Sequence, residues 1–267
     1  YQATTQYLGF SNYGDEYKVM GLASYGKPVY LDEFSEILTF EKENYFKLNL
    51  DYFRHHTDEN FKYSFMDGVP KFNNLYSEKF INKFGEPRKA NEKITQKHMD
   101  IASSMQNQFE KVVIEILNDI FDKKNNKNLC LAGGCAFNSK LNGILKKNTN
   151  FDNIYIQPNA GDGGGSVGAA LYVNSRYGKK YLNNNSPYLG PKFSNSEIQD
   201  IIEKRDDLKN FKVSKFSNEE IYTITSKKLL NNLVIGWFKG RLEWGPRALG
   251  NRSILANPKN KDIKDIL

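Results

Sequence analysis

The amino-acid sequence predicts an α/β fold, and three observations support this prediction. Apolar side chains recur at intervals of three and four across residues 99–121, which is typical of a long amphipathic helix. Two apolar stretches, NLCLAGG (128–134) and NIYIQP (153–158), have the length and composition of strands. Each runs into a glycine-rich turn followed by a helix-forming segment. Strand, glycine turn and helix thus occur twice in succession, which indicates α/β architecture.

The segments before and after this region are assigned from composition. Residues 14–26 are expected to form a loop and a short helix between glycines. Residues 30–84, rich in Phe, Tyr, Asn and Lys, are expected to form antiparallel sheet and loops. Residues 183–194 are polar, hold two prolines and are the predicted linker.

Two helices and a strand are expected beyond the predicted linker. Residues 194–205 and 217–232 each begin with a serine cap and have acidic residues in the first turn. LVIGWF, residues 233–238, is the expected strand. These elements predict a second domain over residues 191–267, after a first domain over residues 1–190.

Composition excludes several classes of protein. The chain of 267 residues has room for one large or two modest domains, and 39% hydrophobic with 26% charged residues is ordinary for a soluble globular protein. No apolar run approaches the roughly 18 residues of a membrane span, and the first residues lack the features of a secretory signal. We therefore predict a cytoplasmic protein with no membrane partner. The chain begins without methionine and ends within the helix-like KDIKDIL, so we expect a fragment of a longer polypeptide.

Charge, cysteine and histidine patterns narrow the choice further. The net charge of +7 comes from lysines interspersed with acids and asparagines, so no nucleic-acid partner is predicted, whereas small anionic substrates are compatible with it. Cys130 and Cys135 lack the pattern of a disulfide framework or a zinc site and are expected to be reduced, buried thiols. His55, His56 and His98 are expected to be solvated rather than metal-bound.

The first candidate site is the glycine pair of LAGGCAFN. Gly133 and Gly134 lie where a strand becomes a helix. Without side chains there, a nucleotide can approach the backbone, and free N–H groups at a helix start favour anions. Asn138, one turn into the helix, is placed to hydrogen-bond the ligand. The alternative is that the two glycines only permit tight packing.

The second candidate site is the acidic glycine turn of GDGGGSVGAA. Asp162 precedes Gly163, Gly164 and Gly165, so a carboxylate stands beside a backbone concavity able to hold phosphate. A divalent metal between them is the usual way to keep both negative groups together. The alternative is that Asp162 caps the following helix and that the glycines serve close packing.

The third candidate site is the arginine-rich segment from Gly236 to Pro258. Guanidinium groups match phosphate and carboxylate oxygens, and two neutral donors accompany them. The residues concerned are Arg241, Arg247 and Arg252, with Glu243 among them and with Asn251 and Ser253 as the neutral donors. The alternative is a structural network in which Glu243 pairs with an arginine.

Lys18 is a further candidate, in the acidic and glycine-bounded segment DEYKVMGLASYG. A lysine at this place could reach a phosphate. The alternative is an exposed helical start, and the sequence does not separate the two.

Four segments, in this order, resemble hallmarks of one family. They are DEYKVMGLASYG, LCLAGGCAFNSKLNG, QPNAGDGGGSVGAAL and GWFKGRLEWGPRALGNRSILANP. The family is that of the O-carbamoyltransferases of the nodulation protein U and cephalosporin carbamoyltransferase type, and the similarity extends over most of the chain except residues 30–90. The resemblance implies part of an actin-like ATPase (ASKHA) fold, with a mixed sheet and flanking helices, followed by the beginning of a YrdC-like α/β domain.

The resemblance also implies a reaction and its partners. The YrdC-like domain is expected to join carbamoyl phosphate to ATP as carbamoyl adenylate, and the actin-like domain to transfer the carbamoyl group to a hydroxyl of a small-molecule or sugar acceptor. The sequence does not identify the acceptor or the general base. A homodimer is compatible with this reaction.

The resemblance and the chemistry of the residues together give the expected site residues. Those matching the carbamoyl-phosphate segment are Arg247 and Arg252 as catalytic residues, with Arg241, Asn251 and Ser253 as substrate-binding ones. Those expected to bind ATP are Gly133, Gly134, Asn138, Gly163, Gly164, Gly165 and Lys18. Asp162 matches the family's metal-binding carboxylate, with divalent Fe, Mn or Mg as the expected ion. Its usual companions, two upstream histidines in an HxxxH arrangement, do not occur in this sequence, so we expect this fragment alone to be inactive.

Two other functions remain open at this point. An actin-fold small-molecule kinase would explain both glycine turns but leaves the segment EWGPRALGNRS without a role. A nucleotide-binding module without catalysis is also compatible with the basic charge.

Overall fold

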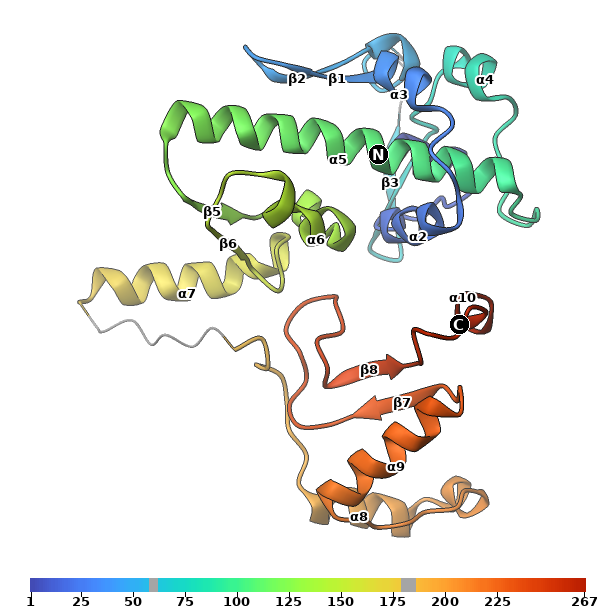
Figure 1. Cartoon of the computed structure of the whole chain (residues 1–267), viewed down its shortest axis with the longest axis vertical. Helices are drawn as coiled ribbons and strands as arrows, with labels where there is room; N and C mark the ends of the chain where they lie inside the picture. Colours follow the sequence, from blue (N-terminus) through green and yellow to red (C-terminus); the bar gives the residue numbers. More distant parts are fainter. Residues whose placement is uncertain (58–61, 179–185) are drawn as a thin grey trace. The chain divides into compact units, whose positions relative to one another are not determined.

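The computed structural model describes residues 1–57, 62–178 and 186–267. They form two compact units, Tyr1–Ile156 and Gln157–Leu267, which Figure 1 traces from blue to red. The predicted α/β class is confirmed as a mixture of helices and small sheets. The expected mixed sheet is not seen in the described ranges, whose strands form four two-stranded sheets. The actin-like and YrdC-like assignments, and the boundary between residues 190 and 191, stay predictions.

The first unit contains the double-glycine turn of Gly133 and Gly134 and the following helices and strands. In chain order these are α1 (Gln2–Tyr7), α2 (Glu16–Leu22), η1 (Ala23–Tyr25), α3 (Leu31–Ile37), β1 (Leu38–Glu41), β2 (Tyr45–Leu48), η2 (Leu50–Tyr52), β3 (Tyr63–Met66), β4 (Val69–Phe72), α4 (Glu78–Phe84), α5 (Gln96–Lys124), β5 (Asn128–Leu131), η3 (Gly134–Phe137), α6 (Ser139–Asn148) and β6 (Asn153–Ile156).

Helix α5 organises this unit and confirms the predicted long helix. It begins with a capping box, in which the Thr95 side chain accepts from the backbone of His98 and the Nδ1 of His98 accepts the Thr95 N–H at 3.0 Å. It ends at Asn125, which adopts the left-handed conformation that commonly closes helices. The predicted apolar stripe is buried at positions such as Ile101 and Leu117 and half-buried at others, such as Val113.

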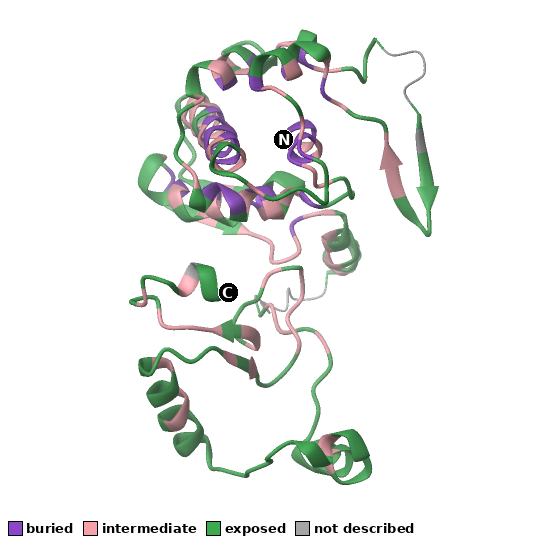
Figure 2. Cartoon of the chain, turned by 90° about the vertical axis from the view of Figure 1, so that its right-hand side faces the viewer, coloured by how far each residue is buried: buried purple, intermediate pink, exposed green. Residues whose placement is uncertain are grey.

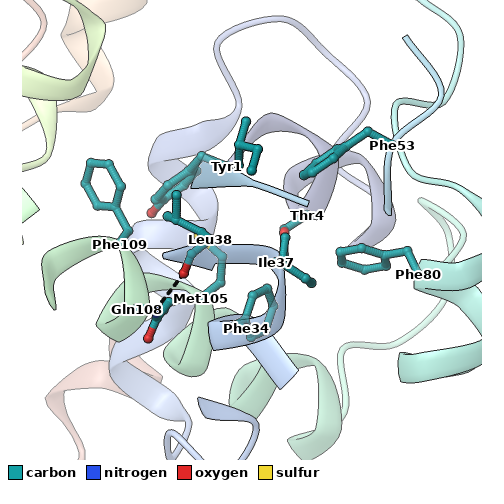
Figure 3. Close-up of a pocket in the computed structure, with 11 residues that line it drawn as sticks. Tyr1, Thr4, Phe34, Ile37, Leu38, Phe53, Phe80, Met105, Gln108 and Phe109 are labelled. Carbon is teal, nitrogen blue, oxygen red and sulfur yellow. Dashed lines mark hydrogen bonds between the residues drawn. The ribbon is translucent and has the colours of Figure 1, made fainter. Parts of the chain in front are cut away.

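The core of the first unit packs against α5, and its buried residues are purple in Figure 2. A small cavity lies within this core, lined by side chains from α1, α3, β1 and α5 (Figure 3). Its walls are mainly apolar, as with Phe34, Ile37 and Met105. None of the predicted site residues lines it, so this cavity is not the candidate site.

The strands confirm the predicted pairing in part. β1–β2 and β3–β4 are antiparallel hairpins, as expected for residues 30–84. Helices α3 and α4 in the same region were not expected. α3 buries Phe34 and Ile37, three residues apart, and has two acidic residues in its first turn, which favours a helix. β5 and β6, the two strands expected from the repeated strand–turn–helix pattern, pair in parallel with Leu129 opposite Ile154.

The second unit contains the acidic glycine turn and the arginine-rich segment. Its elements are η4 (Asp162–Gly164), α7 (Gly165–Arg176), α8 (Asn195–Lys204), η5 (Asp206–Asn210), α9 (Asn218–Leu230), β7 (Ile235–Phe238), β8 (Arg252–Leu255) and α10 (Ile263–Ile266). The predicted serine caps are confirmed, because Ser194 and Ser217 each form a capping box with a glutamate three residues on. β7 pairs with β8 in an antiparallel hairpin. The strand β8 was not expected.

The described part of the predicted linker, residues 183–194, is hydrogen-bonded to the rest of the second unit. The first three residues of the linker lie outside the described ranges. The rest is tied to the arginine-rich segment by backbone bonds, with Gly190 N–H donating to Leu242 O and Leu242 N–H donating to Pro191 O, both at 3.0 Å. The hydroxyl of Tyr188 also donates to Leu249 O at 2.7 Å. Prolines here end regular structure without releasing the chain from the unit.

The cysteine prediction is half right. Cys130 and Cys135 are free, but both are exposed, so their expected burial is wrong. Cys130 lies on the outward face of β5, whose residues alternate between exposed and half-buried, and Cys135 lies in the exposed η3 turn. In the parts of the chain that the structure describes, no helix combines the length and apolarity needed to cross a bilayer.

Candidate functional site

The double-glycine turn of the first unit is open to solvent. Gly133 has φ of +93°, a conformation that favours glycine, and it precedes the η3 turn that leads into α6. A Cβ built on either Gly133 or Gly134 would meet no atom within 4 Å. The turn is therefore not closed by packing, and the alternative of glycines for tight packing is not supported here. The space beside the backbone fits the approach of a ligand.

Asn138 closes the turn from the buried side. Its Oδ1 accepts from the N–H of Leu141 at 2.9 Å and so caps α6. Its carboxamide also forms a reciprocal pair with Gln106 of α5, at 2.9 and 3.0 Å. Only 8% of Asn138 is exposed. The predicted ligand-binding amide is thus held rigidly from two sides.

The segment that contains Lys18 lies beside this turn. The Ser139 hydroxyl, at the start of α6, contacts the sulfur of Met20 in α2 at 3.7 Å. Lys18 itself forms an ion pair with Asp15 at 2.8 Å, and this hydrogen bond raises the pKa of the ammonium group. The structure therefore brings the first two motifs together. The charge of Lys18 is paired with a carboxylate, and its predicted contact with ATP stays a prediction.

The acidic glycine turn lies in the second unit. Asp162 is exposed, and its carboxylate makes no hydrogen bond that caps α7, because the capping position is Gly164. A Cβ on Gly164 would lie 2.2 Å from the carbonyl oxygen of Asn159, whereas one on Gly165 would meet nothing within 4 Å. Close packing thus accounts for Gly164, while Gly165 faces open space.

Glu243 organises the arginine-rich loop between β7 and β8. Its Oε1 accepts three backbone N–H groups, from Leu249 at 3.1 Å and from Asn251 and Arg252 at 2.8 Å. Burial raises the pKa of Glu243, but these N–H groups lower it more, to about 2. The alternative in which Glu243 pairs with an arginine side chain is therefore replaced by one in which it fixes the loop backbone.

The arginines of this loop donate mainly to neutral carbonyl groups. Arg241 donates to Gly190 O at 2.8 Å and to Leu189 O at 3.0 Å. Arg252 donates to Lys239 O at 2.8 Å and to Gly240 O at 3.1 Å. No ion pair found between described residues involves Arg241 or Arg252. Their positive charges are positioned but not neutralised, which suits the binding of an anion.

The neutral donors of the loop are engaged locally. The Asn251 amide donates to Arg241 O at 2.7 Å, and the Ser253 hydroxyl accepts the Gly250 N–H at 3.2 Å. Arg247 is half-buried in the same loop. Arg252 and Ser253 lie at the start of β8, so the sheet fixes their positions.

Pro158 and Asn159 join the glycine turn to the arginine loop. Gly245 has φ of +105°, and a Cβ there would lie 2.2 Å from Pro158 O. The next residue, Asn159, packs against Gly163 and Gly164. The second and third candidate sites are therefore adjacent. Neither Pro158 nor Asn159 was predicted from the sequence, because their role comes from backbone contact rather than from side-chain chemistry.

A pH-dependent stability is expected from Glu243. Since its pKa falls from 4.5 to about 2 on folding, its carboxylate stabilises the second unit fully above about pH 4.5, and this contribution is lost as the pH falls towards 2. Glu243→Gln should therefore unfold at lower urea concentration than wild type near about pH 7, with the difference shrinking below about pH 4.5. Fluorescence of Trp237 and Trp244, the two tryptophans of the chain, reports this unit. A difference that stays constant down to about pH 2.5 would contradict the assignment.

The described residues do not assemble a metal site. No group of three or more His, Cys, Asp or Glu side chains with suitable geometry is found within residues 1–57, 62–178 and 186–267. Asp162 remains a single candidate ligand. His55 and His56 are exposed in a turn, as expected for solvated histidines.

Comparison with known proteins identifies the class. The family profile described as "Carbamoyltransferase N-terminus" matches residues 1–171, and the one described as "Carbamoyltransferase C-terminus" matches residues 226–267. The two matches cover most of the chain. The chain belongs to the carbamoyltransferase family, as its four motifs predict.

The similarity to known relatives extends over nearly the whole chain. The protein sll1178 of Synechocystis is 39% identical over 100% of this chain, which covers 42% of that protein. Nodulation protein NolO of Bradyrhizobium diazoefficiens is 35% identical over 99% of the chain, which covers 44% of NolO. Nodulation protein NolNO of Sinorhizobium fredii is 31% identical over 99% of the chain, which covers 35% of NolNO. The chain thus spans less than half the length of these relatives.

Proposed function

We propose that the protein is an ATP-dependent O-carbamoyltransferase. Carbamoyl phosphate, water and ATP give carbamoyl adenylate with release of orthophosphate and pyrophosphate, and the carbamoyl group is then transferred to a hydroxyl of an acceptor with release of AMP. Family membership supports carbamoyl transfer. The observation that carries the proposal is the arginine loop, in which Glu243 fixes the backbone while Arg241 and Arg252 keep charges that no described carboxylate neutralises.

The arginine loop fits a small phosphorylated anion. Two guanidinium groups held by carbonyl oxygens offer their charge without needing to reorganise, which favours stabilisation of an anionic group during reaction. Carbamoyl phosphate is such an anion. Arg247, Asn251 and Ser253 lie in the same loop and are proposed as further contacts.

The double-glycine turn fits a nucleotide. Gly133 and Gly134 leave open space beside the backbone, and the Asn138 amide lies at the inner side of the turn. Bound ATP would supply the adenylyl group that makes AMP a good leaving group. In this chain the turn would bind and orient the nucleotide, and no step of the reaction is assigned to Lys18 while Asp15 pairs with it.

The described residues do not fit a divalent metal ion. Asp162 offers one carboxylate, and no group of three or more potential ligands includes it in the described part of the chain. No step is therefore derived through a metal, and Asp162 is proposed only as one ligand of a divalent ion in the full-length protein.

The reaction products test the proposal. Full-length protein is incubated with ATP and carbamoyl phosphate, and the phosphorus species are followed by ³¹P NMR. With a hydroxyl acceptor present, the proposal predicts AMP, pyrophosphate and the orthophosphate released from carbamoyl phosphate, formed only when both substrates are present. ADP as the product would indicate a phosphotransferase instead, and binding of ATP without turnover, in the presence of a range of sugar hydroxyl acceptors, would indicate a non-catalytic module.

A further inference from the structure

The carboxamide side chains of Gln106 and Asn138 form the centre of a buried polar network next to the double-glycine turn. Gln106 of α5 is completely buried, and all four of its side-chain hydrogen-bonding positions are used. Its Oε1 accepts from the Tyr1 hydroxyl at 2.6 Å and from Asn138 Nδ2 at 2.9 Å. Its Nε2 donates to Glu110 Oε1 at 2.7 Å and to Asn138 Oδ1 at 3.0 Å.

The two ends of the network fix the direction of both amides. The backbone N–H of Leu141 can only donate, so Asn138 must present its Oδ1 there. The Glu110 carboxylate, with Lys140 at 3.6 Å, accepts, so Gln106 must present its Nε2 there. A flip of either amide would place a donor against a donor or an oxygen against an oxygen. The sequence of donors and acceptors therefore has one consistent arrangement.

The consequence is a defined N–H donor on the residue that joins η3 to α6. Asn138 Nδ2 carries two hydrogens, and one of them is donated to Gln106. The second has no partner among the described residues. Asn138 is more than nine-tenths buried and lies five residues after Gly133, whose turn is open. A buried N–H without a partner is costly unless a ligand accepts from it.

We infer that Gln106 and Glu110 are positioning residues, which hold the Asn138 carboxamide as an N–H donor to an oxygen of the nucleotide bound at the Gly133–Gly134 turn. The inference rests on the proposed function, since it takes the ligand of this turn to be ATP. Gln106 and Glu110 lie one helical turn apart on α5, on the side that contacts Asn138. They act through Asn138 and not by contact with the nucleotide.

Gln108 provides a matched control. It is the same residue type on the same helix, and only 4% of it is exposed. Its Nε2 donates to Leu38 O at 2.8 Å, the dashed line in Figure 3, and it is not part of the network around Asn138. Gln106→Met and Gln108→Met each replace a buried carboxamide by an apolar chain of similar shape.

The experiment measures ATP binding to the full-length protein by isothermal titration calorimetry. Gln106→Met should raise the Kd for ATP by about tenfold or more, as expected when a hydrogen bond to the ligand is lost. Gln108→Met should change it less than about twofold, although both variants lose thermal stability. In steady-state assays Gln106→Met should raise the KM for ATP and leave the KM for carbamoyl phosphate unchanged.

Asn138→Asp keeps the inference testable if Gln106→Met folds poorly. Aspartate caps a helix as well as asparagine does, so α6 should be retained, while the N–H donor becomes an acceptor. We expect a loss of ATP affinity of at least about tenfold with an unchanged circular dichroism spectrum. Wild-type affinity in Gln106→Met or in Asn138→Asp would overturn the inference while leaving the proposed function intact. Failure of the wild-type protein to bind ATP would instead overturn the proposed function, and this inference with it.

Discussion

Gly26→Ala should lower the free energy of unfolding of the first unit by about 2–3 kcal/mol, which is roughly 5–10 °C in melting temperature. A Cβ at this position would lie 2.0 Å from the carbonyl oxygen of Met99 and 2.6 Å from the N–H nitrogen of Asp100. Both atoms belong to the backbone of α5, which cannot move without disturbing the core. The contact joins η1 to α5, and the neighbouring Lys27 N–H donates to the Asp100 carboxylate at 2.7 Å.

Gly21→Ala is the control for this prediction. Gly21 lies in the same motif, inside α2, and a Cβ there would meet nothing within 4 Å. Replacing an interior helical glycine by alanine should stabilise the chain by up to about 1 kcal/mol. Thermal unfolding followed by far-ultraviolet circular dichroism checks both. Equal melting temperatures for the two variants would show that the close approach of η1 to α5 does not exist.

Gly245→Ala should disrupt the arginine loop. The left-handed φ of +105° costs an alanine about 1–2 kcal/mol, and the clash with Pro158 O at 2.2 Å adds about 1–3 kcal/mol. Since Pro158 precedes Asn159, which packs on the glycine turn, the displacement should reach both candidate sites of the second unit. We expect a shift of the tryptophan fluorescence transition to lower urea, and a fall in kcat/KM for carbamoyl phosphate of at least about tenfold in the full-length protein.

Gly250→Ala separates backbone strain from the clash. Gly250 has φ of +102°, close to that of Gly245, but a Cβ there would meet nothing within 4 Å. It should therefore lose only the strain contribution of about 1–2 kcal/mol. Loss of the same stability in both variants would mean that the contact between Gly245 and Pro158 contributes nothing to the loop.

Elements with a strong periodic pattern could be predicted from the sequence. The apolar stripe of α5 predicted both the helix and its buried face, because a side-chain period near 3.6 admits no other regular structure. Strands β5 and β6 followed from the repeated strand–turn–helix order. The caps at Ser194 and Ser217 followed from their glutamates three residues on.

Elements held by tertiary contacts could not be predicted. Helices α3 and α4 have seven residues each, which is too short for a clear hydrophobic period. They are held in place by aromatic packing, such as that of Phe34 on Phe84, whose ring centroids lie 4.9 Å apart. Strand β8 was hidden within the arginine-rich motif, because its residues were assigned to chemistry and not to sheet formation. Its pairing with β7 is what fixes Arg252.

The candidate site shows the same division. Residue types pointed to Asn138 and to the arginines, whose chemistry can be recognised from sequence alone. The role of Gln106 could not be recognised from the sequence, because a polar residue among the buried positions of a helix does not reveal its hydrogen-bond partner. Its partner lies 32 residues away in the sequence. Pro158 is recognised only through the space that Gly245 leaves for it.

A crystal structure of the full-length protein with a non-hydrolysable ATP analogue is the most direct test of the proposed nucleotide site. We predict the nucleotide at the turn of Gly133 and Gly134, with an oxygen of the ligand within hydrogen-bond distance of Asn138 Nδ2 and the hydrogen-bonded pair between Asn138 and Gln106 intact. A nucleotide bound elsewhere, with this turn covered by other side chains, would contradict it.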